Sequence, residues 1–440
     1  METPRFQVPY GHDSISFQLP PGMKATVVAS KPTRPLEDPE AAIQAALADP
    51  IASPPLRALV DDKDSAAVTA CIVFTDITRA SPDDLLVPAL LRELESAGVP
   101  DQNITLLCGI GMHRPSTPEE KVIKLGQDVV DRYRVIDNEP QNAEALVDLG
   151  LTKGGVPVSA HRAAVEADLL LATGLVEPHQ YAGYSGGRKT VAVGAAGEKL
   201  IAFTHGPDFV DHPGTRLGRL EGNPFHEAIT EAARRAGLDF ILNVVLDDEK
   251  RIVGVKAGEP AETHRQLVSF ARSIYEVPIP HQVDVAVAGV GYPKDANLYQ
   301  ASRAASYLFF APTPVVRPGG FLIVPAGCEE GAGEGVGEQR FLNAMREAPD
   351  VQAILCDARD HGYPPGQQRA FVMAKVLEEV RVVIVGSECP GVIEACKMTP
   401  AETMEEALAL AQSELGDELD ALVVPHALLT LPVVQAEGPH

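Results

Sequence analysis

Long apolar runs are absent from this chain of 440 residues. No segment approaches the roughly 20 consecutive apolar residues that a membrane-spanning helix requires, so we expect no membrane partner. The first ten residues carry charge and lack an apolar core, which argues against a secretory signal peptide. The sequence therefore predicts a cytoplasmic protein.

Excess positive charge and paired cysteines are also absent. The chain has 37 lysines and arginines against 61 aspartates and glutamates, a net charge of −24. This charge repels a phosphate backbone, so we expect no nucleic-acid partner, although a local basic pocket for a small anion is compatible with it. The six cysteines form no C-x-x-C pair, which argues against a zinc ribbon or a disulfide framework and favours reduced, mostly buried thiols.

Short apolar runs alternate with amphipathic stretches along nearly the whole chain, and this alternation predicts an α/β fold. In the N-terminal half, strands are expected at 68–74 and 103–108, and a hairpin at 240–246 and 251–255. Helices are expected at 88–97, after the capping residues Thr117 and Asn223, and at 261–275.

Pro278 and Pro280 interrupt this pattern, because two prolines this close cannot lie within a continuing helix. We place a domain boundary here. It separates an N-terminal α/β catalytic and cofactor-anchoring domain, residues 1–276, from a C-terminal Rossmann-like domain, residues 281–440, with a mostly parallel sheet. The last strand or the tail is a candidate to pack back on the N-terminal domain. The expected strands are 283–288, 320–324, 351–355, 382–385 and 421–424, the expected helices are 298–310, 369–379 and 401–415, and 326–338 is expected to be a flexible loop.

Three loops that follow predicted strands or precede helices carry groups suited to chemistry, and strand ends are where open α/β sheets place their sites. The first holds Asp76, Thr78 and Arg79, which suit an anion or a ribose, or else form a turn with a surface ion pair. The second, residues 109–114, delivers His113 after two glycines. A histidine titrates near pH 6.5 and can give or take a proton, although a lone loop histidine is also compatible with simple exposure.

The third loop, residues 177–189, is the densest and contains His179. Its turn Ser185-Gly186-Gly187 can expose backbone N–H groups to an oxyanion or a phosphate. Lys189 suits a point charge on phosphate, a nucleophile joined covalently to a cofactor, or the lysine of a pyridoxal phosphate enzyme. A glycine-rich surface turn with two solvated cations is the remaining interpretation.

The order and spacing of these residues resemble the lactate racemase family, from about Phe6 to Pro432. The matching pattern comprises Asp76-x-Thr78-Arg79, His113-Arg114, His179 ten residues before Lys189, His205 sixteen residues after it, the segment from Gly291 to Gln300, and the tail from Thr399. No single motif is specific, but the ordered set is.

The resemblance implies two domains with the active site in the cleft between them, and a nickel-pincer nucleotide as cofactor. This pyridinium mononucleotide carries a thioamide and a thiocarboxylate and holds nickel through two sulfurs and a ring carbon. By matching position, Lys189 is implied to hold the cofactor covalently through the thioamide, and His205 to be the fourth nickel ligand, which suits tetragonal Ni(II). Separate cofactor maturation proteins are implied as partners. The other implied cofactor contacts are Asp76, Thr78, Arg79, Ser185, Gly186 and Gly187.

The resemblance also implies a reaction, in which His113 and His179 match the family's paired acid/base histidines. The α-hydrogen of a 2-hydroxy carboxylate is too weakly acidic for a histidine of pKa near 6.5. Moving it as hydride to the cofactor leaves a 2-keto acid, and return of hydride to the opposite face inverts C2, with one histidine for each enantiomer. We therefore expect an isomerase, a 2-hydroxy acid racemase or epimerase. Its implied substrate-side residues are Arg79, Tyr299, Gln300 and Arg303.

Two departures from lactate-active members concern the substrate. Arg303 stands where those members have a lysine, and the chain has no tryptophan, whereas they place one beside the substrate. An arginine can hold a carboxylate through two bonds but is longer and planar, so the pocket must differ. A sugar acid or malate is then as strong a candidate as lactate.

Three other functions share parts of the pattern. A family member that only stores nickel or cofactor would need neither acid/base histidine. A pyridoxal phosphate enzyme would use Lys189, but the flanking histidines argue against it. An NAD-dependent dehydrogenase would use Gly289-x-Gly291, which lacks the third glycine and the acid about 20 residues on.

Overall fold

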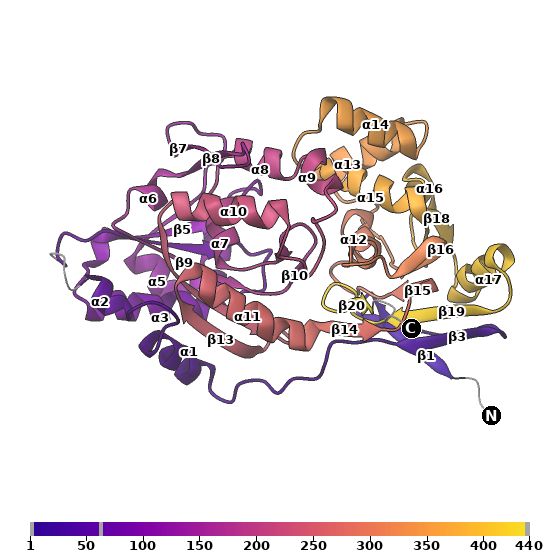
Figure 1. The fold of residues 1–440 in the computed structure, drawn as a ribbon, viewed down its shortest axis with the longest axis horizontal. Coiled ribbons are helices and arrows are strands. Elements are labelled where there is room, and N and C mark those ends of the chain that lie inside the picture. Colours follow the sequence, from indigo (N-terminus) through magenta and orange to yellow (C-terminus); the bar gives the residue numbers. More distant parts are fainter. Residues whose placement is uncertain (1–3, 61–64, 436–440) are drawn as a thin grey trace.

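The computed structural model describes residues 4–60 and 65–435, which form two six-stranded sheets side by side along the long axis of the molecule (Figure 1). The first sheet has the order β13-β12-β9-β4-β5-β6. Its strands are β4 (Ala70–Thr75), β5 (Ile104–Gly109), β6 (Arg134–Asp137), β9 (Leu169–Leu175), β12 (Leu238–Leu246) and β13 (Ile252–Gly258). The hairpin β12–β13 is antiparallel, and the other neighbours pair in parallel.

Both faces of the first sheet are covered, which explains why β4 begins with five consecutive buried residues. The helix α3 (Asp83–Ser96) packs on one face of β4 and β9, and a π-helical turn, η2 (Thr190–Gly194), packs on the other. The other elements of this half are α1 (Pro39–Ala48), α2 (Leu56–Val60), η1 (Asp101–Asn103), α4 (Pro118–Leu125), α5 (Gln127–Arg132), β7 (Leu146–Leu151), β8 (Pro157–His161), α6 (Arg162–Val165), α10 (Pro224–Arg235) and α11 (Pro260–Tyr275).

The second sheet has the order β18-β17-β16-β15-β19-β3, and every neighbouring pair is parallel, as predicted for a Rossmann-like unit. Successive residues of its strands enter two different cores. Helices α12 and α15 pack on one face, and α17 with the hairpin β1–β2 packs on the other. The bounds are β1 (Arg5–Tyr10), β2 (Asp13–Gln18), β3 (Met23–Val27), β15 (Val283–Ala288), α12 (Leu298–Phe309), β16 (Val316–Pro325), α13 (Val336–Glu347), α14 (Val351–His361), α15 (Gln368–Glu379), β17 (Arg381–Val385), α16 (Pro390–Ala395), β18 (Thr399–Ala401), α17 (Met404–Leu415) and β19 (Leu419–Val424).

The chain passes between the two sheets more than once. The N-terminal strand β3 lies at the edge of the second sheet beside β19, and Figure 1 shows these indigo and yellow segments together. The segment with Pro278 forms the strand β14 (Glu276–Ile279), which pairs in parallel with β20 (Leu431–Val434) near the C-terminus. The division of the chain at residues 276 and 281 stays a prediction.

Most predicted elements are present, including the helices that begin after the caps Thr117 and Asn223. The strand predicted at 351–355 is wrong. That segment begins α14, where the Asp350 carboxylate accepts a hydrogen bond from the Ala353 N–H at 2.8 Å and caps a helix. The helix predicted from 88 begins at Asp83 instead, with Pro88 inside it, and the predicted loop 326–338 ends in the first turn of α13.

Gly289 and Gly291, the two glycines of the dinucleotide-binding alternative, instead let the backbone pass close to Pro425 and Pro9. A Cβ added to Gly289 would lie 2.3 Å from the carbonyl oxygen of Pro425, and one on Gly291 (φ +66°) would lie 2.8 Å from Pro9. Four of the six free cysteines are buried, as predicted. Within residues 4–60 and 65–435, no helix combines the length and apolar character that crossing a membrane requires.

Candidate active site

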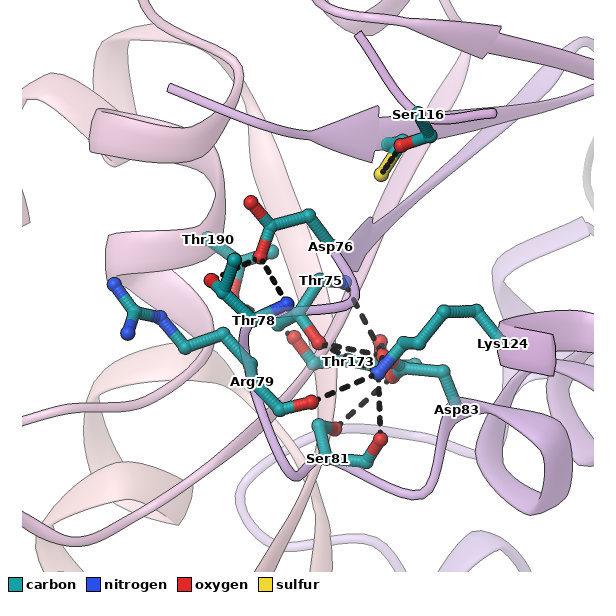
Figure 2. A network of polar contacts seen from close by, with 11 residues as sticks. Thr75, Asp76, Thr78, Arg79, Ser81, Asp83, Ser116, Lys124, Thr173 and Thr190 are labelled. Carbon is teal, nitrogen blue, oxygen red and sulfur yellow. Dashed lines mark hydrogen bonds and ion pairs between the residues drawn. The ribbon is translucent and has the colours of Figure 1, made fainter. Parts of the chain in front are cut away.

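The loop after β4 is folded around the carboxylate of Asp76. Its Oδ1 accepts hydrogen bonds from the Thr78 N–H (3.2 Å) and hydroxyl (2.6 Å), which closes a tight turn (Figure 2). Its Oδ2 lies 2.5 Å from Nδ1 of His113, in the loop after β5. Burial alone would raise the pKa of Asp76, but the hydrogen bonds from His113 and Thr78 and the charge of Arg79 lower it below its ordinary value. Asp76 is therefore a carboxylate that accepts the Nδ1–H of His113.

A buried ion pair holds this loop from behind. Lys124 Nζ, on α4, lies 2.8 Å from the Asp83 carboxylate, and the two residues are only 6% and 1% exposed. Asp83 also accepts the hydroxyls of Thr75 and Thr173, both at 2.6 Å, which links β4 to β9. Lys124 donates to the carbonyl of Ser81 (2.7 Å), as Figure 2 shows. The pair thus ties both ends of the Asp76 loop to the sheet.

Replacing Lys124 by methionine is expected to destabilise the protein by about 3–5 kcal/mol, because Asp83 is left as a buried charge without its partner. Lys121 on the same helix provides the matched control, since its pair with Asp137 is more exposed, with side chains 18% and 14% accessible. Lys121→Met should cost less than Lys124→Met, because water reaches both side chains of this pair and screens the charge left on Asp137. Urea denaturation of the cofactor-free protein measures both, and equal losses would contradict the role given to Asp83.

His113 is delivered by a close contact between the end of β5 and η2. A Cβ on Gly194 would lie 2.8 Å from the carbonyl oxygen of Gly109, so only glycine permits this approach. Gly111 (φ +56°) then turns the chain, and its N–H donates to the Gly194 carbonyl at 2.9 Å. The His113 side chain is 48% exposed. With Nδ1–H donated to Asp76, its Nε2 presents a lone pair, the form of a general base.

The turn before Lys189 is held by polar side chains from two distant elements. The N–H of Gly187 donates to Oδ1 of Asn243 on β12 at 2.6 Å, and Nε2 of His264 on α11 lies 2.7 Å from the carbonyl oxygen of Ser185. A Cβ on Gly186 (φ +134°) would lie 2.5 Å from the His264 ring. The sequence did not single out Asn243 or His264, although a polar residue within an apolar strand or helix face is the signal that marks them.

Two details of that turn differ from the sequence-based interpretations. Arg188 is not a solvated cation, because it is 6% exposed and its Nη2 lies 2.7 Å from Nδ1 of His264. The backbone donors predicted for an anion are in part used internally, since the N–H of Ser185 donates to the Glu177 carbonyl at 2.9 Å. The Ser185 hydroxyl donates to the Leu175 carbonyl at 2.6 Å. These bonds fix the position of the turn.

Lys189 lies in α7 (Gly187–Lys189), directly before η2. A π-helical turn within helical structure is frequent at functional sites. Burial and the nearby charge of Arg79 lower the pKa of Lys189 to about 7, although Asp76 and Glu177 oppose them. Near neutral pH, a large fraction of this amine is therefore unprotonated and nucleophilic.

His205 caps the C-terminal end of α8 (Glu198–Thr204), which precedes α9 (Pro207–Asp211). Its Nδ1 lies 2.8 Å from the Ile201 carbonyl oxygen, so Nδ1 carries the hydrogen and Nε2 the lone pair. The Tyr181 ring packs edge-on against it, with centroids 5.2 Å apart. Burial and the charge of Lys189 lower the pKa of His205 to about 4. A neutral imidazole with an oriented Nε2 is the form that binds a metal.

His179 lies in the small hairpin of β10 (Pro178–His179) and β11 (Gly183–Tyr184). Its Nδ1 accepts hydrogen bonds from the N–H groups of Tyr181 (3.3 Å) and Ala182 (3.2 Å), so in the neutral ring Nε2 carries the hydrogen. Burial and the charges of Lys189, Arg79 and Arg303 hold the pKa of His179 well below its ordinary value. In their neutral forms, Nε2 of His113 is thus a hydrogen-bond acceptor, whereas Nε2 of His179 is a hydrogen-bond donor.

Side chains of α12 complete the cluster from the second sheet. Asn297 caps this helix through the Gln300 N–H (3.1 Å), and the next turn brings Arg303 within 3.3 Å of the Gln300 side-chain oxygen. Among the described residues, no group of three or more His, Cys, Asp or Glu side chains is arranged to hold a metal ion. The charges that act on one another here are the cations Arg79, Lys189, Lys294 and Arg303 and the anions Asp76 and Glu177, an excess of positive charge that suits anionic ligands.

The structure therefore places most of the predicted site residues close enough for their charges to shift one another's pKa values. Asp76, Arg79, His179, Lys189, His205 and Arg303 all act on at least one other member of the group. His113 joins it through Asp76. Thr78, Ser185 and Gly187 use their described hydrogen bonds to shape the loops, and Tyr299 lies with Gln300 in the first turn of α12.

Two family models together match most of the chain. Residues 10–218 match the model described as the lactate racemase N-terminal domain, and residues 279–431 match the lactate racemase C-terminal domain. The chain is 32% identical to the lactate racemase of Thermoanaerobacterium thermosaccharolyticum over 423 residues, covering 95% of this chain and 97% of that protein. It is 33% identical to the lactate racemase of Lactiplantibacillus plantarum over 392 residues, covering 88% and 89%.

Solved structures agree with these matches. The structure of the lactate racemase apoprotein from Thermoanaerobacterium thermosaccharolyticum aligns with a TM-score of 0.87 at 29% identity, covering 98% of this chain and 100% of that one. A protein from Thermotoga maritima aligns with a TM-score of 0.66 at 20% identity, covering 90% of this chain and 98% of that one, a likeness of fold.

Proposed function

This chain belongs to the lactate racemase family and is an isomerase of the racemase type, and on that premise we propose that it inverts C2 of a 2-hydroxy carboxylic acid with a nickel-pincer nucleotide. The observation that carries the proposal is the grouping of a lowered-pKa lysine, an oriented imidazole and an Asp–His pair around one anion-binding region. Cofactor maturation proteins are proposed partners.

The residues present fit this cofactor. A nucleotide that brings two sulfurs and a ring carbon to nickel needs one further ligand from the protein, and Nε2 of His205 suits that position because Nδ1 is bound to the Ile201 carbonyl. Lys189, with a pKa of about 7, suits the covalent link. Arg79 offers a cation for an anionic group of the nucleotide, and the turn of Ser185, Gly186 and Gly187 holds Lys189 in place. When bound, the nucleotide would supply a reversible hydride acceptor for C2, which these residues would hold in place.

The protein's own part is proton transfer and orientation. His113, with Nδ1–H donated to Asp76, accepts the proton of the substrate hydroxyl at Nε2. The 2-keto acid that results is planar at C2, so either face can receive hydride when it turns over. His179 offers Nε2–H to the oxygen that return of hydride turns into an alkoxide. Giving that proton up leaves His179 as an imidazolate, a negative charge that the nearby cations Arg79 and Arg303 stabilise, while the proton taken from the first hydroxyl stays on His113. For the opposite enantiomer the two histidines exchange roles.

The substrate side is proposed to consist of Arg79, Tyr299, Gln300 and Arg303. Arg303 has five N–H donors, and lactate offers only a methyl group beyond its hydroxy acid head. A buried donor left unpaired costs about 1–3 kcal/mol, and about 1.4 kcal/mol corresponds to a tenfold change in specificity. We therefore propose malate or a sugar acid as a better substrate than lactate, with Arg303→Lys narrowing the difference.

Nickel binding separates the role of His205 from that of His113. His205→Ala is expected to lower the nickel content of the isolated enzyme at least about tenfold, because the protein's metal ligand is lost. His212→Ala is the control, since His212 is exposed and lies just beyond α9. Elemental analysis per chain measures the effect. An equal loss of nickel in His113→Ala and His205→Ala would contradict this division of roles.

Turnover tests the proposed function as a whole. Cofactor-loaded enzyme is incubated with single enantiomers of lactate, malate and gluconate, and chiral chromatography follows the appearance of the opposite C2 configuration. Inversion of at least one acid is the expected result. Protein that carries nickel and cofactor but inverts none of a broad panel of 2-hydroxy acids would instead be a store for the cofactor.

A further inference from the structure

Two arginines on the C-terminal side of the site form no salt bridge within the part of the chain that the structure describes. Arg303 donates to the Gln300 side-chain oxygen (3.3 Å) and the Tyr307 hydroxyl (3.2 Å). Arg369, in the first turn of α15, is 7% exposed, and its Nη1 donates to the Ser306 hydroxyl at 2.8 Å. Hydroxyl and amide oxygens satisfy donors but do not neutralise a guanidinium charge. Glu177 acts on Arg303 through its charge, whereas Arg369 is a buried cation that contacts no carboxylate among the described residues.

Two buried donors at the same place have no acceptor within residues 4–60 and 65–435. One is Nε of Arg369, and the other is the side-chain nitrogen of Gln180. Gln180 is 3% exposed, and its side-chain oxygen accepts the Ser306 hydroxyl at 3.0 Å, so Ser306 joins Gln180 to Arg369. Buried donors are almost always paired, and the exceptions require an explanation such as a missing ligand.

This position borders the reacting region. Gln180 follows His179 directly in the chain, and the Tyr181 ring lies 6.0 Å from the His179 ring and 5.2 Å from the His205 ring. Arg369 lies over the Tyr299 ring at 5.7 Å. Burial lowers the pKa of Arg369 below its ordinary value, while the nearby Tyr181 hydroxyl opposes this. Arg369 thus contacts Tyr299, a predicted substrate-side residue, and its charge interacts with Tyr181, whose ring packs near both histidines.

The spacing along α12 relates the two arginines to each other. Arg303 and Ser306 are three residues apart on one helix, so they lie on the same face within about one turn, ~5.4 Å. Because Arg369 is bonded to the Ser306 hydroxyl, its Nη1 lies beside α12, about one turn from the backbone of Arg303. A short ligand with an anionic group at each end suits such a pair of cations.

Resting on the function proposed above, we infer that Arg369 and Gln180 form a second anion subsite beside Arg303, which binds the distal carboxylate of a 2-hydroxy dicarboxylic acid. A carboxylate compensates the guanidinium charge and accepts from Nε of Arg369 and from Gln180. The hydroxyls of a sugar acid would accept hydrogen bonds from these donors but would not neutralise the guanidinium charge of Arg369. The methyl group of lactate would neither accept a hydrogen bond nor neutralise the charge. The subsite thus selects a dicarboxylate over both.

Binding of unreactive acids tests the subsite without turnover. Succinate and propionate lack the 2-hydroxyl group, and calorimetry with the cofactor-loaded enzyme should show succinate bound at least about tenfold more tightly than propionate. Arg369→Met should weaken succinate about 10- to 100-fold, the range of a lost hydrogen-bonded charge, and Arg369→Lys should restore part of it. Arg359→Met is the matched control, because Arg359 also lies over an aromatic ring but is already paired with Asp211.

Kinetics supply the second readout. The kcat/KM ratio of malate to lactate should fall about 10- to 100-fold in Arg369→Met. Succinate bound no better than propionate, gluconate preferred to malate, or a variant with lowered stability and an unchanged ratio would each overturn the subsite. If Arg369-dependent succinate binding is found in an enzyme that inverts no acid, the subsite stands and the proposed function fails.

Discussion

Lys189→Ala is expected to abolish covalent attachment of the cofactor and to reduce racemase activity below detection. Lys189 lies in the turn held by Asn243 and His264, and its pKa of about 7 leaves a large fraction of its amine neutral near pH 7. Most lysines remain charged there, with pKa values near 10.4. Intact mass spectrometry of enzyme isolated with its cofactor should show an adduct in the wild type and none in this variant.

Lys294→Ala is the matched control for the attachment. Lys294 is also partly buried, and burial together with Arg303 lowers its pKa to about 8, so it is the most comparable lysine of the cluster. The adduct mass should persist in this variant. An adduct that survives in Lys189→Ala, or one that is lost equally in both variants, would remove Lys189 as the anchor.

His113→Ala is expected to lower kcat by about 10²- to 10⁴-fold, the usual contribution of a positioned general base, while nickel and cofactor content stay at the wild-type level. Asp76→Asn should also lower kcat, because an amide can donate to Nδ1 and so favour the tautomer that has no lone pair on Nε2. His212→Ala, with an exposed histidine, should leave kcat unchanged.

The pattern of losses distinguishes catalysis from folding. A base role predicts low kcat in His113→Ala and Asp76→Asn together with unchanged cofactor absorption. If His113→Ala retained full activity, or lost the cofactor along with it, the assignment of the base would be wrong. Thermal unfolding of the variants checks that the loop after β5 is still folded.

The site residues that the sequence predicted share one property, since they follow strands or lie in short loops with recognisable spacing. Asp76 and His113 are examples, and their loops meet because β4 and β5 are parallel neighbours whose ends lie at the same edge. Lys189 was first noted for the glycine turn before it, whereas His205 was found only through its spacing within the family pattern.

The residues that the sequence did not reveal act through partners far along the chain. Lys124 resembles a solvated lysine on an amphipathic helix, and its partner Asp83 resembles an ordinary acid of a first helical turn. Arg369 is positioned by a hydrogen bond to Ser306, which lies 63 residues away in the chain. The strand prediction for residues 351–355 was wrong for another reason. A short apolar run fits a strand or a helix equally well until its capping residue is identified.

The path of the N-terminus was also beyond local reasoning. β3 completes the second sheet although nearly 400 residues of chain separate it from its neighbour β19. Its sequence, Met-Lys-Ala-Thr-Val, contains no feature that names the sheet it joins. Pairing between strands so far apart in the chain depends on tertiary structure, which a local pattern does not encode.

We propose that C2 is inverted by movement of hydrogen as hydride, and an isotope label at C2 distinguishes this route from proton removal. Cofactor-loaded enzyme is incubated in ordinary water with a single enantiomer of malate that is deuterated at C2, and a parallel reaction uses lactate labelled in the same way. The two enantiomers are then separated by chiral chromatography, and mass spectrometry measures the deuterium content of each. We expect the opposite enantiomer to appear with deuterium retained at C2, because hydrogen that leaves and returns as hydride does not exchange with water. An opposite enantiomer that carries hydrogen from water at C2 would contradict it, because that outcome requires removal of the C2 hydrogen as a proton.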